Sequence, residues 1–283
     1  MRQLFVLVVV IALSATATAD EGMWIFDNVP RQAIAKKYGV TLTDQWLQRL
    51  QQSVVRLETG CTASFVSPEG LVLTNHHCVA TCLADNSTAE RDYVARGFTA
   101  TTRENELRCQ GAQASVLTAT ENVTDRVTKA LAGTRPDRAT ALRNETLTNL
   151  EAQCEAAAKK AGSPFACEAV PLYQGGQYWL YKYRRYTDVR LAFAPEAAIA
   201  AFGGDPDNFQ FPRWCLDMAL LRVYENGKPA ATPTHLSFAW SGAVQGEPVF
   251  VASARRTTTS RRDKFVAELS ARVGADGRRA RQG

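Results

Sequence analysis

The sequence predicts a mostly β fold with helical insertions, and three observations lead to this prediction. Short runs of β-branched and aromatic residues recur along the chain, and turn signals such as Pro68–Gly70 and Asn226–Gly227 separate them. One segment near residues 122–162 switches to a helical periodicity. The composition, 46% hydrophobic and 22% charged, is ordinary for a globular protein. Short strands with tight turns favour a barrel or a sandwich.

The N-terminus has the features of a secretory signal. Met1-Arg2 supplies a positive start, residues 4–13 are an unbroken apolar run, and Ala17-Thr18-Ala19 is typical of a cleavage site. We therefore predict a signal peptide over residues 1–19 and a mature protein that is periplasmic or secreted. An N-terminal membrane anchor is the alternative. No later segment is apolar and long enough to span a bilayer, so no membrane contact is expected after cleavage.

Export changes how the seven cysteines are interpreted, because disulfides persist outside the cytosol. The expected pairs are Cys61–Cys78, Cys82–Cys109 and Cys154–Cys167, which leave Cys215 over. A zinc site is the other interpretation of cysteines near histidines. The chain has no CxxC pair, and three adjacent residues, His76-His77-Cys78, suit a tetrahedral site poorly. We predict no metal and no cofactor.

The formal net charge of +5 is unevenly distributed. Residues 253–283 hold nine Lys/Arg against three Asp/Glu, so this tail alone carries +6. We assign the folded body to residues 20–252, and the positive net charge of the chain therefore says little about it. No nucleic-acid partner is predicted. We interpret residues 253–283 as an atypical tail from a truncated or frame-shifted reading, or as an arbitrary end. A genuine basic tail is the alternative.

The first half of the folded body is expected to hold one helix and three short strands. Thr43 and Asp44 are a helix start ahead of the apolar Trp46 and Leu47. Strands are expected over residues 53–57, 64–66 and 71–74. The turn Pro68-Glu69-Gly70 joins the last two into a hairpin that delivers Asn75-His76-His77 at the end of a strand.

The second half is expected to begin with a helix and then to return to β structure. Pro136 suits a first helical position, and Gly162-Ser163-Pro164 stops the helix. Further strands are expected from residue 170, over 178–193, over 218–224 and over 248–252. Asn226-Gly227 is a hairpin turn signal that closes the third of these strands.

Two residues have the features of a catalytic base and its orienting acid. Histidine is the usual base near neutral pH, although a lone histidine is more often structural. Thr74–Cys78 resembles the histidine segment of chymotrypsin-like peptidases, in which a cysteine follows the base and is bridged to the preceding strand, so the matching base is His77. Asp217 opens an apolar strand and resembles the aspartate segment of the same peptidases. The alternative for Asp217 is a surface residue at a strand start.

No candidate for the nucleophilic serine is found. Such a serine needs a Gly-rich turn whose backbone N–H groups form an oxyanion hole. The chain has neither a Gly-x-Ser-Gly nor a Gly-x-Ser-x-Gly motif. Ser241-Gly242 lacks the preceding glycine, and Ser253 and Ser260 lie in the atypical tail. We nominate none of them.

Two long motifs together resemble one family, the bacterial periplasmic dipeptidyl-peptidases of the 7 and 11 type. The first is Gly60–Cys78, GCTASFVSPEGLVLTNHHC, and the second is Phe202–Arg213, FGGDPDNFQFPR, which runs on to Asp217. Lys37-Tyr38-Gly39 and Tyr173–Pro195 are supporting matches. The resemblance covers roughly residues 22–252. After Ala252 the chain departs from the Gly-x-Pro-Gly turn that is usual in the family.

This resemblance implies removal of dipeptides from the free N-terminus of oligopeptides by a His-Asp-Ser triad. Carried over, His77 is the base, Asp217 is its partner, Asn208 holds the substrate's α-amino group, and Phe209 is an aromatic neighbour in that site. The resemblance also implies a chymotrypsin-like fold of two β-barrels with a helical domain over the cleft, and homodimers at full length. This chain would be the N-terminal part, with the serine beyond residue 283.

Three hypotheses follow for the chain as given. The first is a serine-type dipeptidyl-peptidase that is incomplete here and inactive alone, because a triad without its nucleophile loses nearly all covalent chemistry. The second is a periplasmic protein that kept the amino-terminus site and binds peptides without cleaving them. The third is a structural, disulfide-braced β domain without a ligand.

Overall fold

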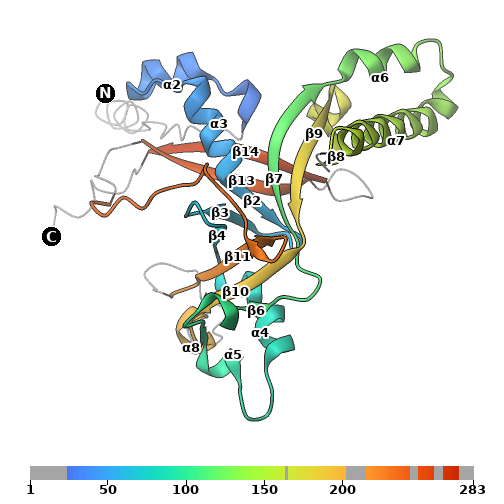
Figure 1. Cartoon of the computed structure of the whole chain (residues 1–283). Coiled ribbons are helices and arrows are strands. Elements are labelled where there is room, and N and C mark those ends of the chain that lie inside the picture. The colour runs from blue at the N-terminus through green and yellow to red at the C-terminus, as the bar shows by residue number, and fades with distance from the viewer. Residues whose placement is uncertain (1–23, 163–164, 202–214, 243–247, 258–263, 274–283) are drawn as a thin grey trace, which may run out of the picture.

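The computed structural model describes residues 24–162, 165–201, 215–242, 248–257 and 264–273, and it is organised around antiparallel sheets (Figure 1). The larger sheet has eleven strands, in the order β5-β10-β11-β4-β3-β2-β7-β9-β8, with β12 paired to β11 and β6 paired to β10. Its strands are β2 (Val54–Leu57), β3 (Thr62–Phe65), β4 (Leu71–Thr74), β5 (Phe98–Thr99), β6 (Leu107–Arg108), β7 (Ala114–Asn122), β8 (Phe165–Leu172), β9 (Gln177–Tyr186), β10 (Asp188–Ala194), β11 (Ala219–Glu225) and β12 (Lys228–Pro229).

The larger sheet curls into a barrel-like part. β9 and β10 are separated only by Thr187 and follow each other as one long bent ribbon (Figure 1). They nevertheless lie near opposite ends of the strand order, where β9 pairs with β7 and β10 pairs with β11. The chain therefore links two strands that are far apart in the strand order. The concave face that results is filled by apolar side chains, with Phe65 and Tyr186 in edge-to-face contact at 6.0 Å. The most buried members of this core are Val55, Val72, Leu83, Ala114, Leu191, Ala219 and Val223.

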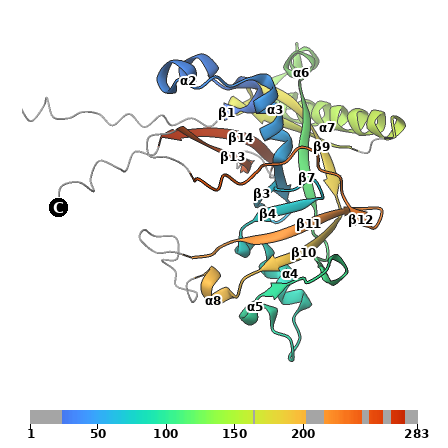
Figure 2. The ribbon, with the colours of Figure 1, turned by 60° about the vertical axis from the view of Figure 1, so that its left-hand side comes forward.

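A second apolar core lies where the N-terminal helices cover the opposite part of the sheet. The segment holds β1 (Trp24–Ile25), η1 (Phe26–Asn28), α2 (Arg31–Tyr38) and α3 (Asp44–Ser53). Its buried side chains include Ile34 and Leu47, which pack with Tyr181 and Tyr183 of β9. β13 (Pro248–Thr257) and β14 (Lys264–Val273) form a hairpin that joins β1 in a three-stranded sheet and lies beside this core (Figure 2).

A helical hairpin projects from the end of β7. It consists of α6 (Thr124–Leu131) and α7 (Pro136–Lys160), and α7 packs on β8 (Figure 1). Val127 and Leu150 are buried with Leu180 of β9 in a third apolar cluster. None of the described helices is long and apolar enough to cross a membrane; α7 has the length but carries charges along it.

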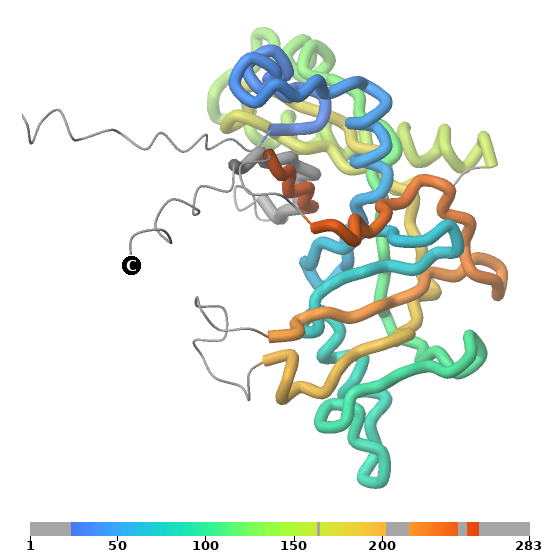
Figure 3. Tube along the Cα trace, turned by 90° about the vertical axis from the view of Figure 1, so that its left-hand side faces the viewer, coloured from blue at the N-terminus to red at the C-terminus, as the bar shows by residue number. Residues whose placement is uncertain are grey.

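The opposite end of the sheet carries short elements, as the trace in Figure 3 shows. They are η2 (His76–Val79), α4 (Ala80–Asn86), α5 (Tyr93–Arg96), η3 (Arg103–Asn105) and α8 (Ala197–Ala200). The remaining short helix, η4 (Tyr173–Gly175), is not part of this group and connects β8 to β9. The disulfide Cys82–Cys109 ties α4 to the segment that leads into β7. This end of the molecule holds the candidate site described below.

Several sequence predictions are confirmed in the structure. The fold is mostly β with helical insertions, and all three predicted disulfides are present, with Cys215 free. Thr43 caps α3 by accepting a hydrogen bond from the Trp46 N–H. Gly70 has a φ of +70°, and a Cβ there would lie 2.6 Å from the Val223 carbonyl oxygen, so the predicted hairpin turn needs glycine.

Other elements differ from the prediction. The run 178–193 forms two strands, because the chain bends at Thr187 to pass from one side of the curled sheet to the other. β7 and α4 were not predicted. β13 extends to Thr257, five residues past the predicted end at Ala252, and pairs with β14 over its whole length. Ala254, one of the residues of β13 beyond the predicted end, is buried in the second apolar core.

Candidate active site

The candidate site forms where β4 ends beside the start of β11. The two strands pair in an antiparallel register that sets Ala219 opposite Thr74. Continued by two residues, this register brings the segment before β11 next to the turn after β4. Asp217 and His77, which are 140 residues apart in the sequence, therefore meet at one edge of the barrel-like part.

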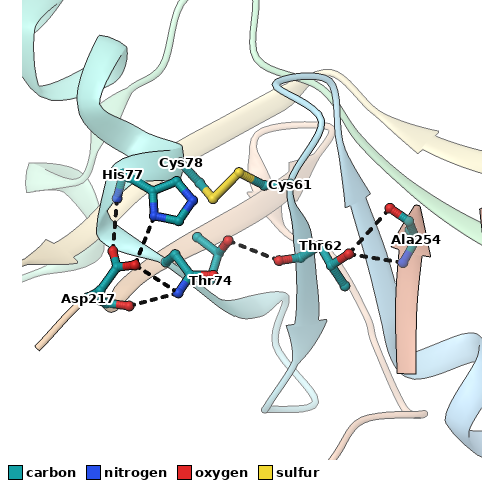
Figure 4. Close-up of a disulfide and its surroundings, with 8 residues drawn as sticks. Cys61, Thr62, Thr74, His77, Cys78, Asp217 and Ala254 are labelled. Carbon is teal, nitrogen blue, oxygen red and sulfur yellow. Dashed lines mark hydrogen bonds and ion pairs between the residues drawn. A yellow bond between two sulfur atoms is a disulfide. The ribbon is translucent and has the colours of Figure 1, made fainter. Parts of the chain in front are cut away.

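The turn after β4 is short and braced. Residues His76–Val79 form the 3₁₀ helix η2, which leads directly into α4. Cys78 is joined to Cys61, the residue before β3, so the disulfide fixes the turn to the neighbouring strand (Figure 4). The Thr74 hydroxyl also donates to the Thr62 carbonyl oxygen at 3.2 Å. A braced turn matters for chemistry, since a small displacement of a reacting group lowers a rate strongly.

The imidazole of His77 and the carboxylate of Asp217 are in direct contact (Figure 4). His77 Nδ1 lies 2.8 Å from Asp217 Oδ2, and the His77 backbone N–H donates to Asp217 Oδ1 at 3.1 Å. An ionised carboxylate only accepts hydrogen bonds, so Nδ1 carries the hydrogen in this contact. The other ring nitrogen, Nε2, is then an acceptor in the neutral imidazole.

The two partners differ in their exposure to solvent. The Asp217 side chain is 9% exposed, whereas the His77 side chain is 59% exposed. A nearly buried carboxylate is costly unless its oxygens accept hydrogen bonds. Asn75 contributes here, because its side-chain amide donates to Asp217 Oδ2 at 3.2 Å and to the Asp217 carbonyl oxygen at 3.0 Å. The arrangement is an oriented carboxylate below an imidazole that reaches solvent.

His76, the other histidine of the motif, lies on the inner side of the turn. It is 6% exposed, and its Nε2 has no hydrogen-bond partner within the part of the chain that the structure describes. Burial lowers the pKa of His76 below its ordinary value, and the nearby Asp217 charge and the Pro195 backbone carbonyl oppose this effect. His76 is thus packed in surroundings that favour its neutral form, while its neighbour His77 is exposed.

The site does not fit a metal ion. One ligand atom each from Cys61, His77 and Cys78 lie within 4.8 Å of one another, a spacing that a metal could use. The two sulfur atoms are, however, bonded to each other. Cysteine binds metals as the thiolate, which a disulfide does not offer. One imidazole alone does not make a metal site.

The remaining sequence candidates are placed as follows. Asn208 and Phe209 lie outside the described residues. Cys215 is a half-buried free thiol two residues before Asp217. Asn75 lies in the motif Gly60–Cys78, but the sequence analysis assigned it no function. The one local indication of a functional position is that Asn75 directly follows a strand. Nothing in the sequence around Asn75 indicates that its partner lies at residue 217.

Comparison with known proteins agrees with this fold and geometry. The sequence profile of the family Peptidase S46 matches residues 19–275. The chain belongs to the peptidase S46 family. The match includes both long motifs and extends past Ala252.

Three S46 relatives give the scale of the similarity. The chain is 36% identical over 245 residues to the Asp/Glu-specific dipeptidyl-peptidase of Porphyromonas gingivalis, covering 81% of this chain and 33% of the relative. It is 34% identical over 266 residues to the Asp/Glu-specific dipeptidyl-peptidase of Shewanella putrefaciens, covering 87% and 35%. It is 32% identical over 227 residues to dipeptidyl-peptidase 7 of Capnocytophaga gingivalis, covering 77% and 31%.

The S46 fold is also found in solved structures. The crystal structure of Porphyromonas endodontalis DPP11 in complex with the dipeptide Arg-Glu matches with a TM-score of 0.73 at 28% identity, over 83% of this chain and 36% of that chain. The mostly β, chymotrypsin-like architecture predicted from the sequence is therefore confirmed. This chain spans about a third of the length of the relatives that it matches.

Proposed function

We propose that this chain supplies the histidine and the aspartate of a serine-type dipeptidyl-peptidase that releases dipeptides from the free N-terminus of oligopeptides. The observation that carries the proposal is the 2.8 Å hydrogen bond between His77 Nδ1 and Asp217 Oδ2, at a braced turn of an S46 chain. Peptidase activity at the family level supports it, because the relatives are named dipeptidyl-peptidases.

In this proposal each group has one role. Asp217 accepts from Nδ1 and keeps the neutral imidazole in the tautomer whose Nε2 carries no hydrogen and can accept a proton. His77 takes the proton of the attacking serine hydroxyl through Nε2 and later gives it to the leaving amine. The Asp217 carboxylate stabilises the imidazolium that exists between these two transfers. The exposure of His77 is consistent with this role, since Nε2 must reach a substrate.

The substrate class follows from the relatives. DPP11 of Porphyromonas endodontalis was crystallised in complex with the dipeptides Arg-Glu and Arg-Asp. We propose oligopeptides with a free N-terminus as the substrate here, with Asn208 holding the α-amino group and Phe209 beside it. An amide oxygen that accepts from an ammonium group anchors the terminus and so defines which peptide bond is cleaved.

The proposed location is the periplasm or the exterior of the cell. The features of residues 1–19 support export, and the three disulfides in the described part of the chain support it as well. Disulfides persist in oxidising compartments and are rare in the cytosol.

The first experiment assays the 283-residue chain with chromogenic dipeptidyl substrates that have a free amino terminus. We expect no release of the chromophore above background. The chain has no serine in a Gly-x-Ser-Gly or Gly-x-Ser-x-Gly motif, and a triad without its nucleophile loses nearly all covalent chemistry. Turnover that disappears in His77→Ala would contradict this expectation and would mean that a serine of this chain serves as the nucleophile.

The second experiment tests the roles of His77 and Asp217 in a complete enzyme. The matching N-terminal third of the Shewanella putrefaciens Asp/Glu-specific dipeptidyl-peptidase is replaced by this chain. We expect the chimera to cleave dipeptidyl substrates, and His77→Ala and Asp217→Asn each to lower kcat by roughly 10⁴-fold. Glu225→Gln, a change in an exposed ion pair with Arg184, is the control and should retain activity. A folded chimera in which Asp217→Asn keeps full activity would contradict the proposed roles.

A further inference from the structure

We propose that Asn75 is a positioning residue that acts through Asp217 to hold the tautomer of His77. The inference rests on the proposed function, because it assigns a task only if His77 and Asp217 work as a pair. It goes beyond that function, since neither the motif nor the relatives' names give Asn75 a role.

The side-chain amide of Asn75 makes two hydrogen bonds, both to Asp217, and we refer to this pair of hydrogen bonds as the clamp. Its Nδ2 donates to the Asp217 carbonyl oxygen at 3.0 Å and to Asp217 Oδ2 at 3.2 Å. One amide group thus holds both the backbone and the carboxylate of Asp217. Oδ2 is the same oxygen that lies 2.8 Å from His77 Nδ1, so the clamp acts on the atom that orients the imidazole.

The conformation of Asn75 is not explained by a local role. Asn75 stands at the N-cap of η2, where an asparagine side chain ordinarily accepts a hydrogen bond from a backbone N–H of the first turn. Here it makes no such cap. The side-chain amide donates instead to Asp217, 142 residues away in the sequence. The local structure of the turn therefore does not depend on this amide.

The donors to the carboxylate explain why the clamp matters. Oδ1 accepts from the His77 backbone N–H, and Oδ2 accepts from both His77 Nδ1 and Asn75 Nδ2. Without Asn75, only groups of His77 itself, among the described contacts, restrain the rotation of the Asp217 side chain. A carboxylate that rotates holds the Nδ1–H tautomer less often. Asn75 is uncharged, so it donates equally well at every pH at which the enzyme could work.

The test measures the tautomer of His77 directly in the full 283-residue chain. The ¹⁵N chemical shifts of the neutral imidazole distinguish the Nδ1–H from the Nε2–H form. In the wild type we expect the Nδ1–H form to predominate. Asn75→Ala should shift the ratio toward the Nε2–H form by roughly threefold to tenfold, which is the net contribution of one ordinary hydrogen bond.

Two further variants separate a donor role from a packing role. Asn75→Asp has nearly the same shape but, once ionised, lacks the donor and places a second negative charge beside Asp217. It should lose the wild-type tautomer ratio at neutral pH, whereas a residue that only fills space would retain it. Asn86→Ala is the matched control, because Asn86 also donates from Nδ2 to two backbone carbonyls, of Cys82 and Arg108, beside the other disulfide of this end. It should leave His77 unchanged.

The outcomes distinguish this inference from the proposed function. A wild-type chain without a preferred Nδ1–H form would overturn the proposed pair and the role of Asn75 with it. A wild-type preference that persists unchanged in both Asn75→Ala and Asn75→Asp would overturn the role of Asn75 alone. If Asn75→Ala does not fold, the shape-matched Asn75→Asp decides the question.

Discussion

The histidine turn, which we define as Asn75 with η2, and the helical hairpin of α6 and α7 are both excursions from the same curled sheet. Each is tied back by one disulfide, Cys61–Cys78 in the turn and Cys154–Cys167 in the hairpin. The hairpin has an apolar cluster of its own, whereas the turn lies at the edge of the barrel core. The two regions nevertheless use carboxylates in different ways.

In the helical hairpin, carboxylates complete an edge strand. Glu151 and Glu155 of α7 accept hydrogen bonds from the backbone N–H groups of Ala169 and Cys167 on β8, the last strand of the sheet. These contacts cover donors that an edge strand would otherwise expose. At the histidine turn, the carboxylate of Asp217 instead accepts hydrogen bonds from two side chains and one backbone N–H of the turn, and one of these side chains is an exposed imidazole. Only the second arrangement holds a proton-accepting side chain that reaches solvent.

Among the variants that test this comparison, removal of each disulfide should change the free energy of unfolding the most. The closed loops are of similar length, with sequence separations of 17 and 13 residues, so replacing both cysteines by serine should cost about 3 kcal/mol of unfolding free energy in either region. Chemical denaturation measures this cost. Only the change at Cys61 and Cys78 should alter the His77 tautomer ratio, measured by ¹⁵N NMR. An equal change from Cys154 and Cys167 would show that the two regions are not independent.

The ion pair between Arg56 and Glu168, which joins β2 to the strand on which α7 packs, should give the next largest effect. Arg56 of β2 donates two hydrogen bonds to Glu168 of β8, at 2.8 and 2.6 Å, and is 5% exposed. Glu168→Gln removes the carboxylate charge that binds this buried guanidinium through two hydrogen bonds. Because Glu168 is 24% exposed, we expect a loss of about 2 kcal/mol, below the cost of breaking a fully buried pair.

The control for that variant is Glu225→Gln. Its partner Arg184 is also bound through two carboxylate contacts, but both side chains are substantially exposed. An exposed pair of this kind should contribute less than about 1 kcal/mol. Equal losses for the two variants would mean that burial of Arg56 does not set the strength of its ion pair.

The smallest expected effect is the pH dependence contributed by His76. Its pKa in the folded protein is lowered by burial from an ordinary value of 6.5. Just below that pH the unfolded chain binds a proton that the folded chain does not, so stability falls as the pH decreases through this window. The unfolding midpoint of His76→Gln should therefore fall less between pH 7.5 and 5.5 than that of the wild type. His235→Gln, at a half-buried histidine of another region, is the control, and an identical slope in all three proteins would contradict the assignment.

How much of this could be predicted from the sequence depends on the range of the interactions. The turn at Gly70, the cap at Thr43 and the start of α7 at Pro136 are local, and the structure has them where the sequence indicates. The pairing of six cysteines was predicted correctly, from nearness in the chain for two pairs and also from the resemblance of the histidine segment for Cys61–Cys78. The bend at Thr187 was missed, because it depends on how the sheet curls and not on a turn signal.

For the candidate site, residue type and motif were enough to nominate His77 and Asp217, since a histidine before a bridged cysteine and an acid before an apolar strand are local patterns. Which neighbour is packed and which is exposed could not be derived in that way, because His76 and His77 are the same amino acid in the same turn. Their difference arises from elements that converge on the turn from distant parts of the chain. The role of Asn75 depends on the same convergence, because a hydrogen bond across 142 residues exists only once β4 and β11 have paired.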